Sequence, residues 1–103
     1  MYSTEEVNTS TLYANNWYDI IGTLALPLGT YLIIVNLQVT LKEIKIFDNN
    51  INDFYFTQPT SNAISLILSK SNSMNLMIKG MPSTNITLTK SARYNFFQAI
   101  RLA

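Results

Sequence analysis

The chain contains no cysteine and no histidine. Without cysteine there can be no disulfide framework, and without either residue the serine–histidine, cysteine–histidine and histidine–metal arrangements are excluded within this chain. Only three glycines are present and they are not grouped, so a glycine-rich phosphate-binding loop is absent too. We therefore expect a protein that is not an enzyme and that holds no cofactor and no metal.

Charge is scarce as well. Charged residues make up 13% of the chain, whereas about 25% is usual in soluble domains. The few lysines and arginines are scattered and form no basic run, so nucleic acid is not an expected partner. Solubility must come from the abundant asparagine, threonine and serine, or from surface that is hidden in an oligomer. This composition is typical of an extracellular or virion-surface β-protein.

One uncharged stretch, residues 20–41, is long enough to span a bilayer. Pro27 and Gly29 break it near its centre, and Asn36 and Gln38 place amides in its second half. Its β-branched residues favour strands, and a Pro-x-Gly sequence favours a turn. The stretch therefore predicts a central hairpin over residues 17–40 and no membrane insertion.

Short β-rich segments recur along the whole chain and are separated by asparagine, proline, glycine and serine clusters. This spacing predicts an all-β fold, an antiparallel β-sandwich, in a single domain over residues 1–103. An edge strand is expected near residues 6–12 and the last strand over 94–102. Further strands are expected over 42–47, 54–58, 63–70, 75–79 and 85–89.

Two segments carry a family resemblance: the LPLGTY turn at residues 26–31 and the terminal FFQAIRLA at residues 96–103. Both resemble jelly-roll domains of the tumour necrosis factor-like superfamily, especially those at the tips of bacteriophage tail and head fibres. The resemblance implies a jelly roll that assembles as a homotrimer, with the sheet of the first and last strands facing inward. By position in these motifs, Tyr31, Phe96 and Ile100 are the expected interface residues. The implied role is a non-enzymatic structural component on the virion surface, a fibre or tail tip that contacts the host.

Polar, turn-forming segments at residues 48–53, 58–62 and 71–73 are the expected binding loops, because loops on a rigid scaffold commonly carry recognition. Their neutrality favours a host cell-surface saccharide, held by amides and by a stacking aromatic such as Trp17 or Tyr18. The residues assigned to this binding are Asp48, Asn50, Asn52, Asp53, Gln58, Asn62 and Asn72.

Three alternative functions stay open. The first is a capsid decoration or head fibre protein, and the second is a bacterial surface or spore-coat adhesion domain resembling the complement-type head. The third is a calcium-dependent lectin, because Asp48, Asn50 and Asn52 match the first three ligand positions of a calcium loop. That match then fails, since Asp53 stands where glycine is needed and Pro59 where the bidentate glutamate should be.

Overall fold

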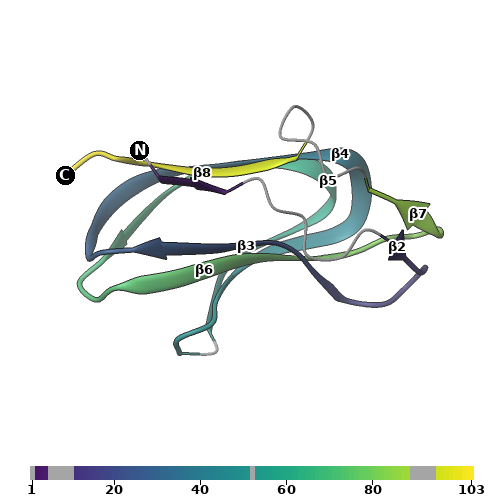
Figure 1. Cartoon of the computed structure of the whole chain (residues 1–103), viewed down its shortest axis with the longest axis horizontal. Helices are drawn as coiled ribbons and strands as arrows, with labels where there is room; N and C mark the ends of the chain where they lie inside the picture. The colour runs from purple at the N-terminus through teal and green to yellow at the C-terminus, as the bar shows by residue number, and fades with distance from the viewer. Residues whose placement is uncertain (1, 5–10, 52, 89–94) are drawn as a thin grey trace.

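The computed structural model describes residues 2–4, 11–51, 53–88 and 95–103, with the backbone alone at positions 53, 54, 56 and 58 (Figure 1). All of its elements are strands, as the sequence predicts. They are β1 (Tyr2–Thr4), β2 (Thr11–Leu12), β3 (Tyr18–Leu26), β4 (Gly29–Asp48), β5 (Asp53–Lys70), β6 (Met74–Met81), β7 (Ile86–Thr87) and β8 (Phe96–Arg101). Within these described ranges, no helix could cross a membrane.

The strands form two facing layers, and the long strands β4 and β5 run through both (Figure 1). The β8 layer contains, in order, β1, β8, residues 29–36 of β4 and residues 63–70 of β5. The β6 layer contains β3, β6, residues 43–48 of β4 and residues 53–59 of β5. β2 and β7 pair at one end of the molecule. Every pairing is antiparallel, so the predicted antiparallel β-sandwich is confirmed, and the strand order is compatible with a jelly roll.

A large bulge forms the corner where β4 and β5 pass from one layer to the other. Asn36 pairs with Ala63, and the next pair is Leu41 with Ser61, so residues 37–40 of β4 face a single residue of β5. Extra residues on one strand bend the ladder without ending it. Residues 42–47 therefore continue β4, and segment 58–62 lies within β5. The prediction that residues 58–62 form a loop is thus wrong, whereas ligand binding there stays a prediction. β5 is an edge strand, where a proline such as Pro59 is tolerated.

The predicted central hairpin over residues 17–40 is also wrong. β3 pairs with β6, whereas β4 pairs with β5, β6 and β8, so the connection at Pro27 and Leu28 joins strands of different layers. A strand has two hydrogen-bonding edges. Residues 29–36 of β4 give one edge to β5 and the other to β8, which leaves no edge for β3.

The ends of the chain agree in part with the predicted strands. Of the edge strand expected near residues 6–12, the structure describes only Thr11 and Leu12, which form β2; residues 6–10 lie outside the described part. The last strand is β8, within the predicted range 94–102, and residue 94 again lies outside the described part.

The core lies between the two layers and is built from alternate residues of each strand. Tyr31, Ile33 and Val35 of β4 are buried in the β8 layer, while Ile44 and Ile46 of the same strand are buried in the β6 layer. The buried positions of β4 are odd as far as Leu41 and even from Ile44 onward, so the alternation changes just after the corner.

Candidate functional site

On the outward side of the β8 layer, the described strand residues whose side chains point away from the core are all uncharged. We call this surface the uncharged face. Its residues are Ser3, Thr30, Leu32, Ile34, Asn36, Ala63, Ser65, Ile67, Ser69, Phe96, Gln98 and Ile100.

The centre of the uncharged face is aliphatic. Leu32 pairs with Ile67 on one side and with Ile100 on the other, so three large side chains lie side by side across β5, β4 and β8. Ile34 follows in the next row of β4. Ile67 is 66% exposed and Ile100 is 37% exposed. Within the single chain, these side chains form an apolar row that is open to solvent.

The outward side of the β6 layer has the opposite character. Lys79 forms an ion pair with Asp19 at 3.5 Å, and its ammonium lies 4.5 Å from the centroid of the Phe47 ring. The ammonium of Lys45 lies 4.3 Å from the centroid of the Trp17 ring. Charged side chains therefore cover the aromatic rings of the β6 layer, whereas no described residue gives the aliphatic row of the β8 layer such a cover.

The three predicted interface residues separate into two groups. Phe96 and Ile100 lie on the uncharged face, because Phe97 and Ala99 between them point into the core. Tyr31 does not, and its assignment to a subunit interface is wrong. It is fully buried within the single chain, because it occupies an inward position of β4.

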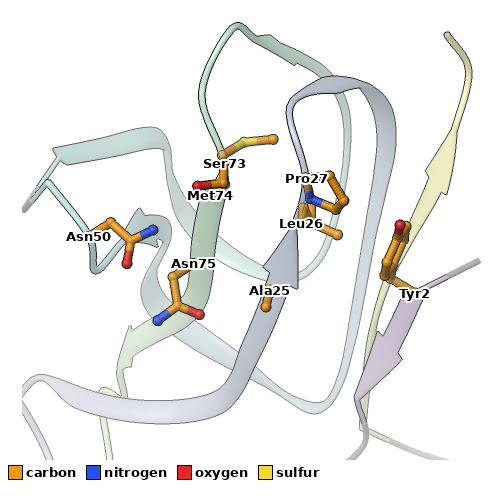
Figure 2. A pocket seen from close by; sticks show the side chains of 8 residues that line it. All are labelled: Tyr2, Ala25, Leu26, Pro27, Asn50, Ser73, Met74 and Asn75. Carbon is orange, nitrogen blue, oxygen red and sulfur yellow. The ribbon is translucent and has the colours of Figure 1, made fainter.

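A second feature is a cavity of about 490 Å³ at the end of the sandwich where three connections meet. These are the β3–β4 connection, the β4–β5 turn and the β5–β6 turn (Figure 2). We call this feature the end cavity. Its lining residues are Tyr2, Ala25, Leu26, Pro27, Asn50, Ser73, Met74 and Asn75.

A buried carboxylate organises one wall of the end cavity. Asp48 is 2% exposed, and its Oδ1 accepts hydrogen bonds from the backbone N–H groups of Asn50 at 3.0 Å and Asn75 at 3.2 Å. Its Oδ2 accepts a hydrogen bond of 2.9 Å from the Tyr55 hydroxyl. The backbone carbonyl of Asn75 in turn accepts a hydrogen bond of 2.9 Å from the N–H of Asn49. Asp48 thus joins the β4–β5 turn to the start of β6.

The predicted ligand-binding residues are only partly brought together. Asn50 lines the end cavity, and Asn72 lies in the exposed turn next to Ser73. Asp48 is wrong as a surface ligand, because it is buried and bonded internally. Asn62 lies at the corner, where its amide donates a hydrogen bond of 3.4 Å to the Leu37 carbonyl. Residue Asn52 lies outside the described residues, and so do the side chains of Asp53 and Gln58.

Sequence reasoning missed most of the cavity. Tyr2, Pro27, Met74 and Asn75 stand far apart in the chain and form no motif, so only their shared place at one end of the sandwich joins them. The clue that was available is the position of Asn75, which lies two residues after the predicted turn at 71–73 and begins a predicted strand.

The two aromatic residues proposed to stack on a sugar do not line the end cavity. The Trp17 ring is met by the Lys45 ammonium, and the hydroxyl of Tyr18 accepts a hydrogen bond of 3.0 Å from the backbone N–H of Tyr13. No group of three or more potential metal-ligating side chains is found in the part of the chain that the structure describes.

Comparison of the chain with protein-family models, with curated proteins and with solved structures finds no match. The family resemblance of residues 26–31 and 96–103 therefore stays a prediction. What the chain does must be argued from the uncharged face and the end cavity.

Proposed function

We propose that this chain is a non-enzymatic structural domain whose copies associate through the uncharged face. The observation that carries the proposal is the contrast between the two outward surfaces. Charged side chains cover the β6 layer, whereas no charged side chain of the described residues covers the row Ile67, Leu32 and Ile100. Monomeric proteins seldom leave a large contiguous apolar patch open to water. The occupant of the face is the same face of other copies of this chain, because an uncharged apolar surface packs well against apolar surface and offers nothing to a charged partner.

Burial in an interface adds stability at these positions. Moving a fully exposed aliphatic side chain out of water contributes about 1.5–3 kcal/mol. Because Ile67 is 66% exposed in the single chain, its burial on association contributes most of that free energy. Ile100 and the half-buried Leu32 and Ile34 add smaller amounts. An interface centred on these residues would be driven by apolar burial and would depend little on salt.

The assembly that we propose is a homotrimer. Its support is the resemblance to trimeric jelly rolls, in which the sheet of the first and last strands faces inward. Here β1 and β8 belong to the layer that carries the uncharged face. In the same proposal the trimer is a fibre or tail tip on the virion surface that contacts the host. Capsid decoration and a bacterial or spore-surface role would use the same assembly.

The mass of the native assembly tests this function. Light scattering or native mass spectrometry should give three times the chain mass for the wild type. Ile67→Asp should shift the mass toward one chain, because it places a charge in an apolar interface. Thr57→Asp is the matched control, since it adds the same charge to an exposed position of β5 in the other layer. A monomeric wild type, or an Ile67→Asp variant that assembles as the wild type does, would overturn the proposal.

A further inference from the structure

We propose that the end cavity is a binding site for a neutral saccharide unit. This inference deepens the host-contact part of the proposed function. It does not depend on assembly, because none of the described lining residues belongs to the uncharged face. The volume of about 490 Å³ lies within the roughly 300–1,000 Å³ that is typical of small-molecule sites.

Among the residues that the structure describes, the lining of the end cavity includes no charged side chain. Its apolar part comes from Leu26, Pro27 and Met74, and its polar part comes from two asparagine amides and the hydroxyl of Ser73. Phosphate, sulfate and carboxylate ligands are bound by arginine, lysine or clustered N–H groups. Because the described lining residues include no lysine or arginine, a neutral ligand with both hydroxyl groups and C–H surface suits this cavity best.

The two amides are the groups that would recognise hydroxyls. Each carboxamide offers an acceptor oxygen beside a donor nitrogen, which matches two adjacent hydroxyl groups of a sugar ring. Among the described residues, neither the Asn50 nor the Asn75 side-chain amide makes a hydrogen bond, so both can bond a ligand. Figure 2 shows these two side chains on the same side of the cavity.

The wall that carries both amides is held in place before any ligand arrives. The backbone N–H groups of Asn50 and Asn75 bond the same buried oxygen of Asp48, so the two residues keep a fixed spacing. Restricting a binding group in advance lowers the conformational entropy that binding would otherwise cost. Asp48 is therefore a positioning residue of the site and does not contact the ligand.

Across the cavity from the amides lies Tyr2 (Figure 2). Its ring packs edge-on against the buried Tyr31 ring, at a centroid distance of 5.9 Å and an interplanar angle of 74°. Aromatic and proline surfaces accept the C–H side of a sugar ring, while amides accept its hydroxyls. Tyr2 with Pro27 on one side and the asparagines on the other thus supply both kinds of contact.

The test is an NMR titration of the full chain with neutral sugars. The probes are methyl glucoside, methyl galactoside and N-acetylglucosamine, with sialic acid as the anionic comparison. At millimolar concentrations at least one neutral sugar should shift the amide resonances of Asn50, Ser73 and Asn75 and show saturation transfer. Asn75→Ala and Asn50→Ala should each weaken its binding about tenfold, the effect of one lost hydrogen bond. Asn16→Ala is the matched control, because Asn16 is exposed and does not line the cavity.

The outcomes separate this proposal from the proposed assembly. Binding that survives in the dissociated Ile67→Asp variant supports the saccharide site even when assembly is lost. The saccharide proposal is overturned if none of the neutral sugars shifts these resonances. It is also overturned if the shifts gather elsewhere, for example around Trp17, or if Asn16→Ala weakens binding as much as Asn75→Ala does.

Discussion

The hydroxyl of Tyr31 donates a hydrogen bond of 2.9 Å to the backbone carbonyl of Pro27. Tyr31 belongs to the β8 layer, and Pro27 directly follows β3 of the β6 layer. The bond therefore ties the two layers together where the chain crosses between them. Because the Tyr31 ring is also fully buried, the tyrosine of the LPLGTY segment acts inside one chain.

Tyr31→Phe removes that hydrogen bond and keeps the buried ring. We expect the free energy of unfolding to fall by about 1 kcal/mol, the usual net value of one intramolecular hydrogen bond. Urea denaturation followed by Trp17 fluorescence measures it. Tyr13→Phe, at a ring that is 57% exposed, should leave the midpoint unchanged. Equal midpoints for Tyr31→Phe and the wild type would show that the bond contributes no stability.

Asp48→Ala removes the acceptor of three hydrogen bonds, from the backbone of Asn50 and Asn75 and from the Tyr55 hydroxyl. Partly buried donors that lose their partner are costly, so we expect a loss of about 2–4 kcal/mol in the free energy of unfolding. Asp19→Ala is the control, since its carboxylate is exposed and its ion pair with Lys79 contributes at most about 1 kcal/mol. Losses of equal size in the two variants would contradict the anchoring role of Asp48.

Calcium should leave the melting temperature unchanged. Both carboxylate oxygens of Asp48 already accept hydrogen bonds from protein donors, so a cation at the β4–β5 turn would have to displace them. A ligand that binds the native state raises the melting temperature as its concentration rises. Thermal scans in millimolar calcium and in chelator should therefore coincide. A clear upward shift in calcium would favour the calcium-dependent lectin.

In the Ile100→Asp variant, the melting temperature should no longer depend on protein concentration, as we expect it to do in the wild type. When association stabilises the native state, the melting temperature increases with protein concentration. Ile100 points away from the core and is 37% exposed, so a charge there should leave the single chain folded. Thermal scans over a wide range of protein concentration should give a rising melting temperature for the wild type and a constant one for the variant. Phe96→Asp, on the same face, should behave alike, and a wild type with a flat profile would argue against assembly.

Much of the strand content follows from local patterns. Alternation around Ile64 and Leu68 correctly predicts the inward positions of β5, and Ile67 between them points outward and is exposed. The alternation of Ile44 and Ile46 is equally clear, and both are buried. Such patterns are local because neighbouring side chains of a strand point to opposite faces, whichever strand lies beside it.

The candidate site is less visible in the chain. The uncharged face could be anticipated in part, because charge is rare in the sequence and Phe96 and Ile100 share a parity that places both outward. The end cavity could not, since Tyr2, Pro27, Asn50 and Asn75 come from four separate segments. Asp48 illustrates the difficulty. The sequence predicts a surface ligand at this loop aspartate, but β6 brings Asn75 beside it, and its carboxylate is a buried hydrogen-bond acceptor.

The amino-acid order by itself determined the strands, the direction of most of their side chains and the absence of the histidine- and cysteine-based chemistries. These properties depend on residue types and on alternation over a few positions. Only the tertiary structure decided that β3 pairs with β6, that β4 and β5 bend through both layers, and that Asn50 and Asn75 bond the same oxygen of Asp48. Strand pairing depends on which hydrogen-bonding edges other strands already occupy, and on where a bulge shifts the register. Both are settled by long-range packing of the whole chain, so a turn such as Pro27-Leu28 leads across the sandwich although its sequence favours a hairpin.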